Sequence, residues 1–312
     1  MSSYDVLVIG GSGVDTIVQV AELQVPPGDY VPVPPIRDYV AHTGNGVALG
    51  FHALGLSTRF IDYLGDDPAG RLIRARYADV GLDFHTLPAP AGTPRSVNLV
   101  DQQGRRFSFY DGRHPADLRL PAEFYRPHVA GARHVHVSRS HFNQDIFEDL
   151  AAAGVTISTD LHAWDGIDPG AHQYAFGSDF VFMSAATVGA EAPGTLRRII
   201  ELGRAQVAVA TDGADGCYVA TRQDPTARHF PAVDPERPVV DSNGAGDAFV
   251  TAFLFGWFNG DPLAECVLAG SVAGAFACGS HGTHEELITG SQLAAAVERS
   301  RRTGAGLPAA PR

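Results

Sequence analysis

Cysteine and basic residues are scarce in this chain of 312 residues, and each shortage excludes a class of protein. Three cysteines, Cys217, Cys266 and Cys278, cannot all pair and lack the spacing of a metal site, so we expect free thiols in a reducing cytoplasm. Arginine and lysine together number 23 against 35 acidic residues, a formal charge of −12. Such a charge is unfavourable for binding nucleic acid or an anionic membrane, because phosphate groups are bound by clustered cations.

Long apolar runs are also missing. No basic segment followed by an apolar one opens the chain, as a secretion signal would. No run approaches the ~18 apolar residues of a membrane helix. Apolar residues nevertheless make up 45% of the chain, which is enough for a substantial core. We therefore expect a cytoplasmic globular protein with neither a membrane nor a nucleic-acid partner.

Segments typical of strands and helices alternate along most of the chain. The opening YDVLVIGG is typical of a buried strand that ends in a tight turn. From about residue 131 the order becomes regular: HVHVS, VTISTD, DFVFMS and QVAVATDG have strand character, and NQDIFEDLAAAG and GTLRRIIELG have helix character. This alternation predicts βαβ units and a mostly parallel sheet covered by helices.

Two other segments predict a smaller group of strands. The stretch 18–42 contains apolar residues interrupted by five prolines, and proline removes a donor from the hydrogen-bond ladder. We expect short edge strands there. The stretch 95–112, RSVNLVDQQGRRFSFYDG, has two strand-like runs around DQQG and predicts a hairpin.

The stretch DSNGAGDAFVTAF, residues 241–253, places small residues between two aspartates. A glycine-rich turn that leads into a helix presents unpaired N–H groups and the positive end of the helix dipole, which together favour an anion. A carboxylate beside such a site suits phosphoryl transfer, because a base accepts the alcohol proton while N–H groups stabilise the phosphoryl. The alternative is that Asp247 only stabilises the start of the helix.

DSNGAGDAF is similar to the signature D-T-x-G-A-G-D-x-F of the ribokinase-like, or PfkB, sugar and nucleoside kinases, with Ser242 in place of threonine. The segments GGSGVD, ALGLSTRFIDYLGDDPAG, STDLHAW (with Asp160) and TDGADG also resemble the family, so the similarity covers nearly the whole chain. The resemblance implies an α/β fold, a three-layer sandwich with a mostly parallel central sheet and a small β-strand lid over the substrate.

The same resemblance implies boundaries and site residues. The core would comprise residues 1–14, 43–92 and 113–300, the lid 15–42 and 93–112, and 301–312 a disordered tail. Asp247 would be the catalytic base, with an anion hole formed by Gly244, Ala245 and Gly246. Substrate would bind at Asp15, Gly44, Asn45, Gly46, Arg139 and His141, and nucleotide at Ser184, Thr211, Gly213, Gly216 and Ser271. A monovalent cation, K⁺, is expected beside Asp241, Asn243, Cys278 and Gly282.

The chain departs from the family pattern at two places. Where the family has G-G-x-x-x-N, this chain has AHTGNG: Ala41 and His42 replace the glycines, Gly46 stands at the asparagine position, and Asn45 precedes it. We expect Asn45 to substitute, and His42 either to contact substrate or to lie on the lid surface.

The second departure concerns N-x-x-E, which becomes Ser184-Ala185-Ala186-Thr187 unless the motif is displaced towards Glu191. Mg²⁺ prefers hard, charged oxygen ligands, so two hydroxyls predict a weaker magnesium site.

Several histidines cluster near two strand ends. His134 and His136 share one face of a strand by its period of two. Zinc would need further ligands at a credible spacing, so we interpret these histidines as polar or substrate-side residues rather than metal ligands.

Together these features favour an ATP- and Mg²⁺-dependent kinase for a hydroxymethyl group of a sugar or nucleoside, with a homodimer through the lid as one possible assembly. The alternative is a degenerate relative that senses nucleotide or sugar. Free sugars, sugar phosphates and nucleosides all stay open as substrates, and a phosphorylated substrate would need cations such as Arg105, Arg106 and Arg139.

Overall fold

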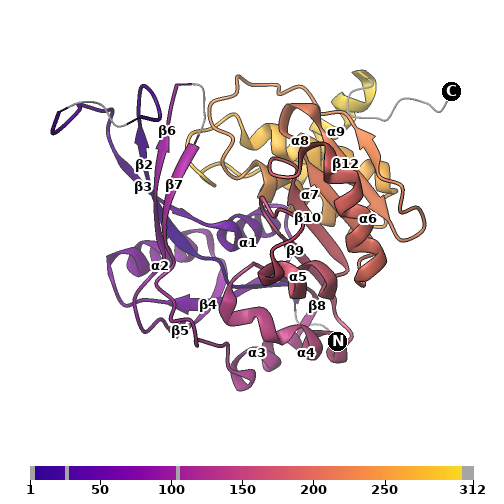
Figure 1. Cartoon of the computed structure of the whole chain (residues 1–312), viewed down its shortest axis with the longest axis horizontal. Coiled ribbons are helices and arrows are strands. Elements are labelled where there is room, and N and C mark those ends of the chain that lie inside the picture. Colours follow the sequence, from indigo (N-terminus) through magenta and orange to yellow (C-terminus); the bar gives the residue numbers. More distant parts are fainter. Residues whose placement is uncertain (1–3, 25–27, 103–105, 304–312) are drawn as a thin grey trace.

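The computed structural model describes residues 4–24, 28–102 and 106–303, which form two sheets and the helices around them (Figure 1). In these residues the larger sheet has nine strands in the order β13-β12-β11-β10-β9-β8-β1-β4-β5. Its strands are β1 (Tyr4–Ile9), β4 (Thr58–Leu64), β5 (Asp83–Pro88), β8 (Ala132–Val137), β9 (Thr156–Asp160), β10 (Phe180–Ser184), β11 (Val207–Thr211), β12 (Cys217–Thr221) and β13 (Arg228–Phe230). From β5 to β11 neighbouring strands are parallel, and β12 and β13 form an antiparallel edge.

Helices cover both faces of this sheet. On one face lie α1 (Thr43–Ala53), α2 (Pro68–Val80), α7 (Ala245–Phe258) and α8 (Leu263–Ala277), with α9 (Gly290–Thr303) packed against α8. On the other lie α3 (Ala122–Val129), α4 (Phe147–Ala153), α5 (His172–Gly177) and α6 (Ala192–Leu202). Short 3-10 turns are η1 (His141–Ile146), η2 (Pro169–Ala171), η3 (Gly189–Glu191) and η4 (Gly213–Asp215).

The central strand β1 shows why the layers form. Its side chains alternate, so that Leu7 and Ile9 pack into the core under α3 to α6, whereas Val6 and Val8 pack under α1 and α7. A strand that is apolar on both faces needs helices on both sides, as the sequence pattern predicts. The predicted three-layer sandwich with a mostly parallel sheet is confirmed.

The second sheet stands beside the larger one, at the upper left of Figure 1. We call it the lid sheet; its strands are β3 (Arg37–Ala41), β2 (Gly13–Gln19), β6 (Arg95–Val100) and β7 (Arg106–Asp111), in that order. β2 and β6 are parallel and the other pairs antiparallel. The predicted hairpin is confirmed by β6 and β7, and part of its turn, with Arg105, lies outside the described residues.

The prediction of edge strands in 18–42 is correct for β3 and wrong for β2, which lies inside the sheet. β2 ends before the prolines, and residues 20–24 and 28–36 contain no strand. Pro32, Pro34 and Pro35, the prolines of this stretch among the described residues, lie outside any strand, as expected for residues that cannot donate to a ladder.

The two faces of the lid sheet differ in chemistry. Asp15, Ser96 and Tyr110 lie opposite one another across three strands, and Asp15 and Ser96 are buried. On the outer face Val97 pairs with Phe109, and both are exposed. The polar face points to the site described below.

At the C-terminus, α9 extends to Thr303, three residues into the predicted tail, and residues 304–312 lie outside the described residues. None of the described helices has the length and apolar character needed to cross a membrane. Cys217, Cys266 and Cys278 are unpaired, and burial raises the pKa of Cys217 and Cys266 to about 12.

Candidate active site

Polar groups gather where the parallel strands end at their carboxyl edge. Ser12 follows β1, Ser138 follows β8, and Asp160, Ser184 and Thr211 are the last residues of β9, β10 and β11. The chain leaves β1 for β4 on one side and later returns to β8 on the other. Ligands of open α/β sheets bind at this switch point, so the site is expected beside the turn after β1.

The start of α7 is the segment for which the sequence predicts an anion site, and we refer to it as the nest. Gly244 has a φ of 78°, and a Cβ there would lie 2.1 Å from the Thr283 carbonyl oxygen, so only glycine fits. The N–H groups of Gly246 and Asp247 meet no acceptor among the described residues. Free N–H groups at a helix N-terminus favour an anion.

Asp247 lies in the first turn of α7 and is 9% exposed. Its Oδ2 lies 2.8 Å from Nε2 of His284, a residue that the sequence interpretation missed. Its Oδ1 accepts no hydrogen bond among the described residues. The carboxylate is therefore held by one oxygen and free at the other.

A second carboxylate lies beside the nest. A Cβ on Gly246 would lie 3.9 Å from Oδ2 of Asp160, whose Oδ1 accepts from the N–H of His162. Burial raises the pKa of Asp160; His162 offsets part of this rise, and repulsion from Asp247 adds to it. Two carboxylates at one nest favour a ligand that brings positive charge with its anion.

Asp15, on the polar lid face, is built as a hydrogen-bond acceptor. Its Oδ2 accepts from Nδ2 of Asn98 at 2.8 Å, and Nε2 of His42 lies 3.3 Å from Oδ1. Burial acts to raise the pKa of Asp15, but His42, Ser96 and Asn98 outweigh it and lower the pKa below its usual value. Apart from the contact of His42 with Asp15 Oδ1, the buried oxygens Asp15 Oδ1, Asn98 Oδ1 and Ser138 Oγ have no hydrogen-bond partner within the described chain. Unsatisfied buried oxygens mark a place for hydroxyl groups.

His42 closes this part of the site. It has a φ of 73°, which is rare for histidine, and its ring covers Gly13, where a Cβ would lie 2.1 Å from the ring. Its ring also contacts Tyr110, with centroids 5.6 Å apart. His42 is therefore largely enclosed between Gly13, Asp15 and Tyr110.

The start of α1 is fixed to the turn after β1. A Cβ on Gly44 would lie 1.9 Å from the carbonyl oxygen of Gly10, and the N–H of Asn45 donates to the Gly11 carbonyl at 3.1 Å. The Asn45 side chain is fully buried and bonds to protein groups on every side: Val40, His284 and Tyr77. It therefore lies behind Asp247 and is not a free amide facing the substrate.

The predicted nucleotide residues meet at neighbouring strand ends. Ser184 and Thr211 pair in register, and η4 follows with Gly213 and Gly216 at φ of 55° and 98°. A Cβ on Gly216 would lie 2.0 Å from the Phe230 carbonyl oxygen, so the turn needs glycine. Ser271 is half-buried on α8.

The hydroxyls that replace N-x-x-E make local bonds. Ser184 Oγ accepts from the N–H of Ala186 at 3.2 Å, and Thr187 Oγ1 donates to the Ala163 carbonyl at 3.0 Å. Glu191 is exposed in η3. The segment 184–187 thus contributes no carboxylate.

The four residues predicted around K⁺ lie together. Asp241 Oδ1 accepts from the N–H and Nδ2 of Asn243, and Oδ2 accepts from the N–H of Gly282 at 3.4 Å. The Cys278 carbonyl already accepts from Val240 at 2.8 Å, and Arg106 donates to Oδ1 of Asn243. These oxygen atoms fit a cation only in part, because the guanidinium of Arg106 already supplies positive charge beside Asn243.

Arg139 and His141 are engaged in contacts with neighbouring protein groups. Arg139 pairs with Asp168, and Nε2 of His141 donates to the Pro115 carbonyl at 2.7 Å. The chain contains no lysine, so arginines must supply the side-chain cations. Among the described residues, Arg106 of lid strand β7 places its guanidinium beside Asn243.

His134 and His136 are core residues. His134 bonds to Thr156 and Ser158, and His136 bonds to the same Ser158 oxygen at 2.9 Å. Burial lowers the pKa of both, that of His136 to about 3. No group of three or more His, Cys, Asp or Glu side chains in the described part of the chain is arranged to hold a metal.

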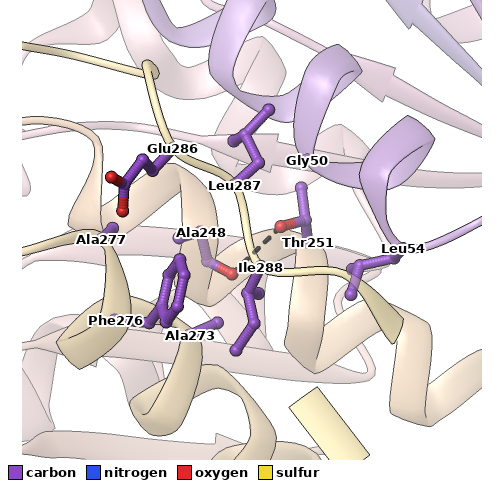
Figure 2. Close-up of a pocket in the computed structure, with 10 residues that line it drawn as sticks. All are labelled: Gly50, Leu54, Ala248, Thr251, Ala273, Phe276, Ala277, Glu286, Leu287 and Ile288. Carbon is purple, nitrogen blue, oxygen red and sulfur yellow. Dashed lines mark hydrogen bonds between the residues drawn. The ribbon is translucent and has the colours of Figure 1, made fainter. Parts of the chain in front are cut away.

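A small apolar cavity lies one turn further along α1 and α7 (Figure 2). Gly50 and Thr251 meet there, and a Cβ on Gly50 would lie 2.8 Å from Thr251. The cavity is lined by Gly50, Leu54, Ala248, Thr251, Ala273, Phe276, Ala277, Glu286, Leu287 and Ile288. Glu286 pairs with Arg237, so its polar groups do not converge on a ligand as a substrate site would.

Comparison with known proteins decides the family. The model of the pfkB family carbohydrate kinases matches residues 40–289. The chain belongs to this family. It is thus a phosphotransferase that acts on a sugar hydroxyl.

Relatives of this carbohydrate kinase include the acarbose 7(IV)-phosphotransferase of an Actinoplanes species. The two are 51% identical over 275 residues, 88% of this chain and 92% of the relative. A fructokinase of Klebsiella pneumoniae is 30% identical over 76% of this chain and 83% of its own. A solved microbiome-derived acarbose kinase superposes with a TM-score of 0.89 at 43% identity, over 96% of this chain and 100% of that one. Arabidopsis thaliana ribokinase, solved with ribose and ATP, has a TM-score of 0.80 at 17% identity over 96% and 99% of the two chains, and supports the fold alone.

Proposed function

We propose that this carbohydrate kinase transfers the γ-phosphoryl group of ATP to a hydroxymethyl group of a sugar, with Asp247 as the general base. The observation that carries the proposal is the position of Asp247 beside the nest of free N–H groups, with Oδ1 unbonded. Oδ1 accepts the proton of the acceptor hydroxyl as its oxygen attacks phosphorus. The N–H groups of Gly246 and Asp247 stabilise the charge on the moving phosphoryl.

The lid face selects the acceptor. Asp15 accepts hydrogen bonds from neighbouring sugar hydroxyls through Oδ1, and the adjacent Asn98 provides a further acceptor in its Oδ1. Identity of 51% with an acarbose phosphotransferase supports a pseudo-oligosaccharide of the acarbose type as the substrate. Four of the predicted substrate residues have indirect roles in this scheme. A Cβ on Gly44 or Gly46 would clash with neighbouring groups, so the two glycines allow close packing. Arg139 and His141 bond to local protein groups.

The nucleotide lies along the ends of β10 and β11 in this proposal, by Ser184, Thr211, Gly213 and Gly216, with Ser271 nearby. Mg²⁺ bound to the phosphates would supply positive charge, and Asp160 is the carboxylate that fits its water shell, because it already lies beside the nest and close to a like charge. K⁺ beside Asp241 would support the nest from behind. The exposed Val97, Phe107 and Phe109 of the lid favour a homodimer through its outer face.

A sensor without turnover is the second candidate, favoured by the hydroxyls at 184 and 187. We expect the double substitution Ser184→Asn with Thr187→Glu to lower the Mg²⁺ concentration at half-maximal rate about tenfold, since hydrogen bonds to charged groups contribute about 1.5–3 kcal/mol. The KM for sugar should stay unchanged, because the sites lie at different strand ends. A magnesium titration of the initial rate measures both.

The matched control is Ser184→Asn with Thr187→Gln, which has the same shape without the charge. If both double variants change the magnesium dependence equally, the carboxylate is not the missing element. If the glutamate variant still transfers no phosphate to any acceptor while it binds ATP, the sensor is the better description.

The substrate class is tested with a panel of acceptors: acarbose, maltose, fructose, ribose and adenosine. We expect ADP release with acarbose at the highest kcat/KM, weaker turnover of simple sugars and none of adenosine. A preference for adenosine over every sugar would contradict the proposed acceptor.

A further inference from the structure

We propose that His284 is a positioning residue for Asp247, a role that rests on Asp247 being the base. His284 lies in the segment after α8, 37 residues beyond Asp247, and nothing in the sequence pattern marks it. Its side chain is 5% exposed and its Nε2 is 2.8 Å from Asp247 Oδ2.

The neighbours of Asn45 define which nitrogen of His284 carries the proton. The Val40 carbonyl oxygen can only accept, so the Asn45 amide must turn its Nδ2 towards it, at 3.1 Å. The second hydrogen of the same Nδ2 then points to Nδ1 of His284, at 2.8 Å. Nδ1 is therefore the acceptor, and the proton of the neutral ring lies on Nε2, directed at Asp247.

Tyr77 completes the chain of bonds. Its hydroxyl donates to Oδ1 of Asn45 at 2.9 Å, and burial raises the pKa of Tyr77 well above its usual value, which keeps it a donor. Both hydrogens of the Asn45 amide and its Oδ1 then have a hydrogen-bond partner. Residues of α1, α2 and β3 thus determine which ring nitrogen of His284 carries the proton.

Glycine at position 46 makes room for this arrangement. A Cβ on Gly46 would lie 2.2 Å from Nε2 of His284 and 2.5 Å from Oδ2 of Asp247. A Cβ on Gly244 would lie 2.9 Å from the His284 ring. The side chains of His284 and Asp247 fill the volume that an asparagine at position 46, as in the family pattern, would occupy. This explains the first departure from that pattern.

The chemical consequence is a carboxylate with one fixed oxygen. With Oδ2 bonded to Nε2–H, rotation of the carboxyl group is restricted and Oδ1 stays directed to the open side. Reacting groups must be held within about 1 Å to keep their rate advantage. Among the described residues, titratable or charged groups near the pair include Asp160 and His162 at the end of β9 and Arg76, whose guanidinium donates to the His284 carbonyl at 3.5 Å.

The test compares His284→Ala with His284→Gln. Glutamine offers an N–H to Asp247 and an oxygen to Asn45, so it can replace both bonds of the ring. We expect His284→Ala to lower kcat about 10- to 100-fold with the KM for ATP unchanged, and His284→Gln to restore most of the loss. His52→Ala and His52→Gln are the matched controls, since His52 lies on the same helix as Asn45 and, within the described residues, bonds only to the Val80 carbonyl; they should leave kcat unchanged.

Two outcomes overturn the inference. A kcat for His284→Ala equal to that of the wild type would do so, as would an alanine variant that folds normally and is not rescued by glutamine. Should the alanine variant fail to fold, the long-range ¹H–¹⁵N correlation spectrum of the wild type still decides: a proton on Nε2 supports the proposal and one on Nδ1 contradicts it. If Asp247→Asn is fully active, the base assignment itself fails; if it is inactive and His284→Ala is normal, only the role of His284 fails.

Discussion

Replacement of Asp247 by asparagine is expected to lower kcat by about 10²- to 10⁴-fold, the usual contribution of a general base. Asparagine keeps the shape and can still accept from His284, but it cannot take the proton of the acceptor hydroxyl. Initial rates of ADP release with saturating sugar measure the loss. ATP affinity, measured by calorimetry, should be unchanged because the nest consists of backbone groups.

Asp261→Asn is the control for this variant. Asp261 lies just beyond the other end of α7 and is exposed, so the same chemical change is made away from the site. Near-normal turnover of Asp247→Asn would remove Asp247 from the mechanism. Loss of ATP binding along with turnover would instead indicate that the substitution distorts the nest.

Asp15→Ala is expected to raise the KM for sugar on the order of 10²-fold, because two hydrogen bonds to a charged acceptor are lost. ATP affinity should hardly change, since Asp15 belongs to the lid sheet and the ends of β10 and β11 to the larger sheet. Steady-state kinetics with each substrate varied in turn separates the two effects.

Asp38→Ala provides the comparison on the opposite face of the same sheet, where Asp38 pairs with Thr16 and Arg95. Its KM values should match the wild type. A result in which Asp15→Ala weakens ATP and leaves sugar binding intact would place Asp15 on the nucleotide side.

The glycine-rich start of α7 and the sheet were predictable because local sequence encodes them. Gly244 is required by a positive φ and a close carbonyl, and the strand ends that carry Asp160, Ser184 and Thr211 follow from the alternation of apolar strands and helices. Features of this kind depend on residues near one another in the chain.

The surroundings of the base were not predictable, because they depend on contacts between distant segments. His284, Asn45 and Tyr77 come from three separate segments, and the glycine at 46 is the one departure in the sequence that coincides with this arrangement. Asp62 is similar: it is fully buried, accepts from the N–H and Oγ of Ser12 at 2.7 and 2.6 Å, and its pKa is raised by burial to about 6. It fixes the turn after β1 from the neighbouring strand β4, which no local motif shows.

The proposed phosphoryl transfer is tested most directly by ³¹P NMR of the wild-type protein with ATP, Mg²⁺ and acarbose. We predict that the γ-phosphate signal of ATP is replaced by that of a phosphomonoester whose phosphorus couples to the two protons of a CH₂ group, with stoichiometric ADP. Formation of inorganic phosphate and ADP without an ester, or an unchanged spectrum under conditions in which both ligands bind, would contradict the proposed kinase reaction.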